Sequence, residues 1–187
     1  MAAKIGDRRR GFPWRLVGWS LAGLLLVAPL AAMQVSSEVN WTPSDFAFAA
    51  ILLGALGLGL ELSFRHVGWD FRLASAVALG AAFVIVWSSG AVGIVGGEDN
   101  PANRLFVGVL AVAALGSVAG RFRPTGLAWT MAATALAQVA VLPVAATIWP
   151  QTIPDVRAPD ALVATAAFAA AWLLSAGLYA KAARRPG

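Results

Sequence analysis

The chain has 187 residues, of which 59% are apolar and 12% charged, with a mean hydropathy of +0.75. Such a composition leaves too few charges to give a soluble globule a polar surface, which excludes that class and indicates a membrane protein. The net charge of +5 would suggest nucleic acid binding in a soluble domain, but in a multi-span protein basic residues mark cytoplasmic loops, so we expect no nucleic-acid partner.

Six apolar runs are long enough to cross a hydrocarbon core of about 30 Å as helices. In chain order they cover about 16–33, 46–64, 73–95, 105–120, 127–148 and 161–180. The polar joints between them are too short to hold a soluble domain. We therefore expect an all-α polytopic bundle of six transmembrane helices, forming one integral-membrane domain over residues 1–187.

The first run has a competing interpretation as a cleaved signal. The stretch "RRRGFPW" contains the Arg-Arg-x-Phe core of a twin-arginine signal, and "LLLVAPLAAM" resembles its apolar region. Pro13 stands where such signals carry an apolar residue, and the run is long enough to span. We expect a retained membrane anchor.

The basic residues predict the orientation of the spans. Twelve of the 14 Lys and Arg residues fall in the N-terminal segment, the second and fourth joints and the C-terminal tail, and only Arg104 and Arg157 lie on the other face. Basic residues near span ends are retained on the cytoplasmic side. Both termini are therefore expected in the cytoplasm.

The second run begins with a capping signal and ends with an acidic residue. In "TPSD", Thr42 can cap the helix, Pro43 suits the first helical position, and Asp45 can complete a capping box. Glu61 lies inside the apolar run, where an ionisable group is a functional candidate. Arg65 lies one turn later, so an ion pair near the interface is expected; a proton or cation site is the alternative.

Between the third and fourth runs lies "GGEDNPANRLF", whose Asn-Pro-Ala triplet is the pore signature of water channels. Those channels carry two such triplets, after their second and fifth spans, whereas this chain has one, after its third. The pore interpretation therefore fails on placement. Asn100 followed by Pro101 is instead the favoured start of a helix, because Asn caps free N–H groups and Pro lacks one.

Acidic and amide residues of the outer joints could together offer oxygen ligands to a hard cation such as calcium. Their spacing does not match a calcium loop, so we expect a hydrated acidic rim and no metal. The candidates are Glu98, Asp99, Asn100 and Asn103, with Glu38, Asn40 and Asp45 from the first joint.

Small and polar residues inside the spans raise two further alternatives. The glycine-rich stretches "GALGLG" and "GAVGIVGG", with Gly116 and Gly120, predict close helix packing. Gln138 and Thr134 give the fifth run a polar edge, for which interhelical hydrogen bonding is favoured over a solute path. Three spans followed by three of opposite orientation would permit an inverted repeat, but the halves do not align.

No catalytic, phosphate-binding or metal-binding motif is present, and the chain has no cysteine and a single histidine, His66, so we expect neither catalysis nor a cofactor. The stretches "VNWTPSDF", "VGIVGGEDNPAN" and "RFRPTG" give a resemblance to a family of small uncharacterised multi-span membrane proteins of proteobacteria, from about Leu24 onward. That resemblance implies a bacterial inner-membrane location and no activity.

Two functions remain open. The first is a non-enzymatic membrane partner or integrity protein, whose glycine-rich faces contact the bilayer, other membrane proteins or a second copy. The second is a small-solute or ion carrier that uses Gln138, Glu61 or the outer acidic joints. An intramembrane enzyme ranks third, because no nucleophile and base pair can be named.

Overall fold

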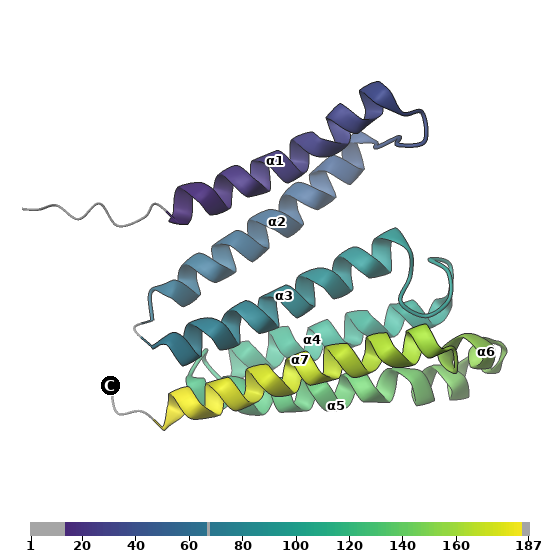
Figure 1. Cartoon of the computed structure of the whole chain (residues 1–187). Coiled ribbons are helices and arrows are strands. Elements are labelled where there is room, and N and C mark those ends of the chain that lie inside the picture. The colour runs from purple at the N-terminus through teal and green to yellow at the C-terminus, as the bar shows by residue number, and fades with distance from the viewer. Residues whose placement is uncertain (1–13, 67, 185–187) are drawn as a thin grey trace, which may run out of the picture. The chain divides into compact units, whose positions relative to one another are not determined.

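The structure, a computed structural model, describes residues 14–66 and 68–184. All regular secondary structure in those ranges is helical, which confirms the all-α prediction. Six of these helices are long and apolar enough to cross a membrane (Figure 1). The chain is a multi-pass membrane protein. The twin-arginine stretch and Pro13 lie outside the described residues.

Contacts along the chain divide it into two compact units, Met1–Glu61 and Leu62–Gly187, here called the N-terminal and C-terminal units. The division falls near the end of the second long helix, so it separates about two helices from four. It does not follow the three-plus-three division that an inverted repeat would need.

The N-terminal unit holds α1 (Trp14–Val35) and all but the last turn of α2 (Pro43–Phe64). The predicted capping box starts α2: Asp45 Oδ2 accepts from the Thr42 backbone N at 2.7 Å, while Thr42 Oγ1 accepts from the Asp45 backbone N at 3.4 Å. Proline at the first helical position completes this start. The backbones of α1 and α2 come close at no more than a few points.

The C-terminal unit is built on α3 (Trp69–Ala91), α4 (Leu105–Ala119), α5 (Pro124–Ile148) and α7 (Pro159–Ala183). Short helices fill two of its connections: η1 (Pro101–Arg104), η2 (Pro150–Thr152) and α6 (Ile153–Val156). Helix α5 packs along α4 and α7, and α7 packs along α3. Their facing sides form the core, whose most buried members include Ala74, Ile85, Phe106, Ala145 and Trp172.

The ends of α3 and α7 are tied together on one side of the C-terminal unit. Lys181 Nζ lies 3.1 Å from Asp70 Oδ1, and the hydroxyls of Ser75 and Tyr179 are 2.8 Å apart. Ser175 donates to the Ala74 carbonyl at 2.9 Å. The start of α3 and the end of α7 therefore share one end of this unit, as an even number of spans requires.

Glycine allows α4 and α5 to meet closely at their connection. A Cβ at Gly126 would lie 2.7 Å from both the Cα and the carbonyl oxygen of Gly120, and a Cβ at Gly116 would lie 2.6 Å from the Thr130 side chain. The chain reverses through Arg121 and Phe122, both with positive φ. The predicted close packing at Gly116 and Gly120 is thus confirmed.

One predicted span boundary is wrong. The third apolar run was expected to remain helical to Val95, but α3 ends at Ala91. Gly93 adopts a φ of +76°, and the backbone N–H groups of Ile94 and Val95 are bound by a side chain from the next helix. Apolar composition alone could not distinguish this buried loop from one more turn of α3.

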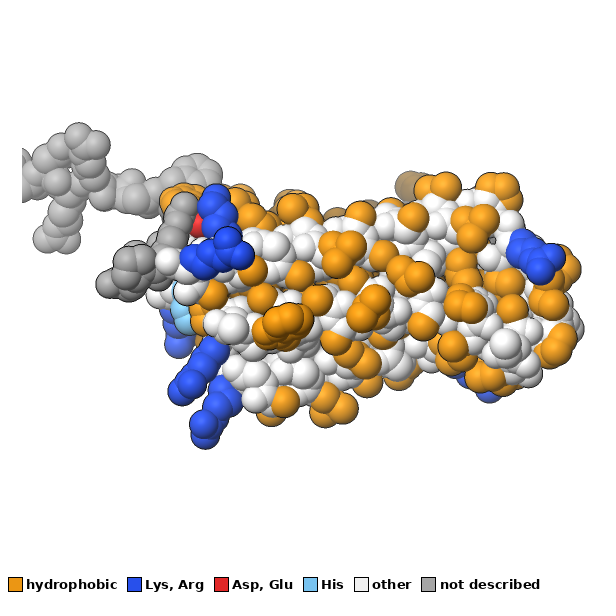
Figure 2. Space-filling model, turned by 90° about the horizontal axis from the view of Figure 1, so that it is seen from below, with side chains coloured by type: hydrophobic (Ala, Val, Ile, Leu, Met, Phe, Trp, Pro, Cys, Tyr) orange, Lys and Arg blue, Asp and Glu red, His pale blue; other side chains and the backbone are white. Residues whose placement is uncertain are grey.

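Apolar side chains also cover much of the outer surface, with Lys and Arg side chains near the helix ends (Figure 2). Large apolar residues remain exposed along every long helix, among them Leu24, Ile51, Val107, Leu136 and Leu173. A soluble protein does not expose so much contiguous apolar surface, whereas a lipid-facing helix must.

Candidate functional site

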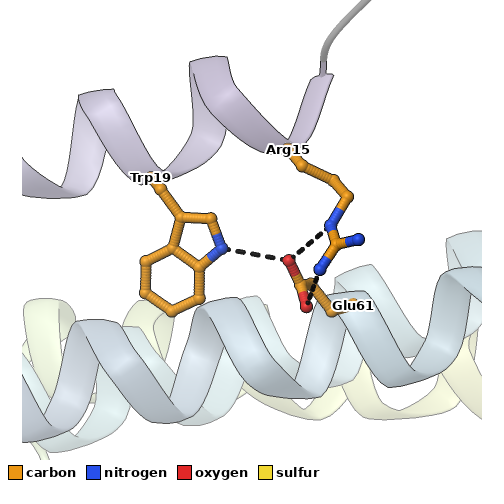
Figure 3. A network of polar contacts seen from close by, with 3 residues as sticks. All are labelled: Arg15, Trp19 and Glu61. Atoms are coloured by element: carbon orange, nitrogen blue, oxygen red, sulfur yellow. Dashed lines mark hydrogen bonds and ion pairs between the residues drawn. The ribbon is translucent and has the colours of Figure 1, made fainter.

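Glu61, the acidic residue inside the second apolar run, is bound by α1. Its carboxylate accepts from Arg15 Nε at 2.8 Å and from Arg15 Nη2 at 2.9 Å, a two-point contact, and from Trp19 Nε1 at 3.0 Å (Figure 3). Arg15 and Trp19 are one helical turn apart and so point to the same place. These three residues are called the Glu61 cluster below.

The sequence predicted an ion pair for Glu61 but named the wrong partner. It pointed to Arg65, one turn later in the chain, whereas the structure shows a pair with Arg15, 46 residues earlier. The bidentate contact between Arg15 and Glu61 fixes the geometry of α1 and α2 at this point as well as pairing the two charges. A pair between Glu61 and Arg65 would not have linked the two helices. The Trp19 ring also fills the space beside Gly57, where an added Cβ would lie 3.0 Å from the ring.

Asn103 organises the loop that follows α3. Its Oδ1 accepts from the backbone N of Ile94 at 2.9 Å and of Val95 at 3.0 Å, and its Nδ2 donates to the carbonyls of Val95 at 3.3 Å and Gly97 at 2.9 Å. The side chain is 7% exposed. All four of its hydrogen-bonding positions are therefore used to hold the backbone of this loop.

Asn100 caps the next helix, as predicted. Its Oδ1 accepts from the Ala102 backbone N at 3.0 Å, and Pro101 follows at the start of η1. The structure adds a second contact that sequence did not reveal: Asn100 Nδ2 donates to Asp155 Oδ2 of α6 at 2.8 Å. The amide thus joins the third joint to the fifth, 55 residues apart.

Glu98 and Asp99 lie exposed on the loop that Asn103 holds. In the first joint, Asp45 is engaged with Thr42 through both backbone and hydroxyl contacts. Within residues 14–66 and 68–184, no three His, Asp or Glu side chains come together as a metal site would need. The cation site, which was the alternative to a hydrated acidic rim, has no such group of ligands in these residues.

Gln138 lies fully buried near the middle of α5, and neither its Oε1 nor its Nε2 hydrogen-bonds to a described residue. Thr134, one turn earlier, donates to the Thr130 carbonyl of its own helix at 2.8 Å. The hydrogen bonding expected between helices at this polar edge is therefore not found. On α7, Thr165 Oγ1 and Trp172 Nε1 are likewise buried without a hydrogen-bond partner among the described residues.

Sequence reasoning missed several residues that now matter, namely Arg15, Trp19, Asp155, Thr165 and Trp172. Arg15 and Trp19 carried a usable signal, because an Arg and a Trp at i and i+4 near a span end can both meet one carboxylate. Thr165 and Trp172, spaced by seven on α7, carried the helical period of a buried face. Asp155 carried none, since its contact depends on the path of two loops.

No family model matches the sequence, and neither a curated protein nor a solved structure is significantly similar to it.

Proposed function

We propose that the protein is a non-enzymatic component of the bacterial cytoplasmic membrane that acts by packing against another membrane protein. The observation that carries this proposal is the presence of glycines on open helix surfaces. A Cβ added at Gly18 or Gly23 of α1, at Gly108 of α4, or at Gly177 of α7 would meet no described atom within 4 Å.

Such glycines need a reason, because glycine inside a helix costs roughly 0.5–1 kcal/mol relative to alanine. Gly57, Gly116, Gly120 and Gly126 have one, since each lies against a neighbouring side chain or backbone. A glycine on an outer surface can serve the same purpose for a helix of another protein, by letting two backbones approach in lipid. The polar candidates Asn100, Asn103 and Glu61 support this view, because each is engaged in holding the chain's own structure.

The test is affinity purification in mild detergent with Gly108→Leu, set against Ala114→Leu as matched control. Both residues are exposed on α4, and their directions around the helix axis differ by about 120°. A stoichiometric partner that copurifies with the native chain and with Ala114→Leu, but is lost with Gly108→Leu, is expected. Equal recovery of every copurifying protein in all three samples would count against the proposal.

The location and orientation form part of the same proposal. The stretches "VNWTPSDF" and "VGIVGGEDNPAN" favour a bacterial inner membrane through the family they resemble, and the basic residues favour cytoplasmic termini. Reporter fusions at Gly97 and after the C-terminus are expected to report opposite sides, with the C-terminal fusion cytoplasmic. Two fusions reporting the same side would refute the six-span orientation.

A small-solute carrier is the second candidate, and Gln138 is the observation that favours it. A buried amide without a protein partner near mid-membrane is where a transported polar molecule could bind. Uptake by reconstituted vesicles that disappears in Gln138→Leu would place this function first.

A further inference from the structure

We propose that Gln138, Thr165 and Trp172 bind a small neutral hydrogen-bonding molecule, of the size of one or two waters, inside the C-terminal unit. The first observation is the state of Gln138. It is 0% exposed, and both polar atoms of its amide lack a hydrogen-bond partner among the described residues. An amide can donate two hydrogen bonds and accept two, so four positions are left open at once.

The free-energy cost makes such an amide unusual. Moving an amide from water to an apolar environment without hydrogen bonds costs roughly 2–7 kcal/mol, depending on the reference. A residue of similar size, such as leucine or methionine, would fill the same space without that cost. A bound polar molecule removes most of the penalty, because buried waters in proteins typically make about three hydrogen bonds to groups of this kind.

Two further unpartnered groups lie on the helix that packs against α5. Thr165 and Trp172 are seven residues apart on the buried side of α7, with exposed fractions of 5% and 1%. The Trp172 Nε1–H can only donate, and the Thr165 hydroxyl can donate and accept. With Gln138, these side chains offer both donors and acceptors to one ligand.

The three residues lie close together in position along the axes of α5 and α7. Helices α5 and α7 are both 25 residues long and are joined through 149–158, so Ile148 and Pro159 lie toward the same end. At about 1.5 Å per residue, Gln138 is about 15 Å from that end, Thr165 about 9 Å and Trp172 about 20 Å. Gln138 therefore lies between the other two in height, within about one helical turn of each.

The surroundings indicate a neutral ligand. Helix α5 has no charged residue, and the only charged residues of α7 are Asp160 and Lys181, close to its two ends. An ion at mid-height would lose its hydration without a countercharge, at a cost of several kcal/mol. A neutral molecule that both donates and accepts has no such cost, and water or a small amide or alcohol fits the groups present.

The experiment measures the thermal stability of the full chain in detergent for Gln138→Leu, Gln138→Met and the matched control Thr134→Val. Thr134 is equally buried one turn away, but its hydroxyl bonds within its own helix. If Gln138 is bound to a ligand, its replacement is expected to lower the melting temperature by roughly 4–8 °C. Thr134→Val should change it by about 2 °C or less, because it removes no contact between helices.

A melting temperature that stays the same or rises when Gln138 is replaced would overturn the proposal. If the site is dry, replacing an unsatisfied amide by an apolar side chain removes a penalty, so Gln138→Leu and Gln138→Met would melt at or above the native temperature. A double-mutant cycle with Trp172→Phe adds a second test that requires only folded protein. A shared ligand makes the double variant lose less than the sum of the two single losses, whereas strictly additive losses would argue against sharing.

The two sources of ligand are separated by titration with acetamide. A saturable rise in melting temperature that Gln138→Leu abolishes would identify an exchangeable solute, and no response together with a destabilising Gln138→Leu would identify water. A crystal structure at a resolution that shows waters should then place density within hydrogen-bonding distance of the Gln138 amide. An amide bonded to a protein carbonyl instead would refute the site.

Discussion

The two units of this protein differ in how much close packing holds their helices together. In the C-terminal unit, 39% of the apolar stretch of α5 is buried, and α3, α4 and α7 contribute to a continuous core. In the N-terminal unit no residue of the α1 stretch is buried, and the helices are held by their connecting loop and by the Glu61 cluster.

This difference follows from what lipid does to helix association. Apolar side chains gain little by leaving lipid for one another, so packing must come from close fit or from polar contacts. The C-terminal unit has close fit, through Gly116, Gly120 and Gly126. The N-terminal unit depends on a directional contact, in which one carboxylate receives three donors. Different substitutions should therefore destabilise the two units.

The largest expected effect breaks the close fit of the C-terminal unit. In Gly126→Ala the new Cβ would fall 2.7 Å from the Gly120 backbone, which cannot move aside as a side chain could. We expect loss of monodisperse protein on gel filtration or a fall in melting temperature above 10 °C. Gly108→Ala, whose Cβ would meet nothing, should match or slightly exceed native stability. Equal behaviour of the two variants would contradict this account.

Next in size is Asn103→Leu, which keeps the branched shape of the side chain but removes four hydrogen bonds to the loop before η1. The buried N–H groups of Ile94 and Val95 would lose their acceptor, at about 2–5 kcal/mol in the free energy of unfolding. Unfolding by increasing denaturing detergent measures this loss. Asn103→Asp keeps the acceptor for Ile94 and Val95 but sets its second oxygen against the carbonyls of Val95 and Gly97, so it should also lose stability. A variant as stable as the native chain would show that the two donated bonds contribute nothing.

Asn100 gives a smaller effect that separates its two contacts. Removing the cap in Asn100→Ala should cost about 1 kcal/mol. Capping rules alone predict that Asn100→Ser and Asn100→Asp are both tolerated. The contact with Asp155 changes that expectation, because Asn100→Asp would set two carboxylates against each other while Asn100→Ser would not. The Asn100→Asp variant should therefore be less stable than Asn100→Ser in the same denaturation assay. If Asn100→Asp were the more stable of the two, the contact with Asp155 would be refuted.

Glu61→Gln is expected to have the smallest effect on unfolding. Its effect should be confined to the N-terminal unit. The chain has no cysteine, so cysteines introduced at the exposed Leu21 and Leu58 can carry the only two spin labels. The distance distribution between α1 and α2 should broaden in Glu61→Gln, with little change in the melting of the C-terminal unit. Glu38→Gln, which alters an exposed acid of the connecting loop, serves as control. An unchanged distribution would show that the Glu61 cluster does not hold the helices.

Much of the fold could be predicted because bilayer thickness fixes how long an apolar helix must be. Capping at Thr42 and Asn100 could also be predicted, since both interactions are local in sequence. The errors share a different cause. The pairing of Glu61 with Arg15, the end of α3 and the contact of Asn100 with Asp155 all depend on residues brought together by the path of the chain. The i and i+4 spacing of Arg15 and Trp19 shows that they can meet one carboxylate, but it does not show which carboxylate.

The span of the Asn103 contacts also bears on the order of assembly during synthesis. They reach back only six to nine residues, so closing that loop costs little chain entropy and needs no later helix. The turn between α3 and α4 can therefore form as soon as residue 103 has emerged. The link from Asn100 to Asp155 must wait for more than fifty further residues, or several seconds at ribosomal speeds of about 5–20 residues per second. A nascent chain arrested between these points should already protect Ile94 and Val95 from hydrogen exchange.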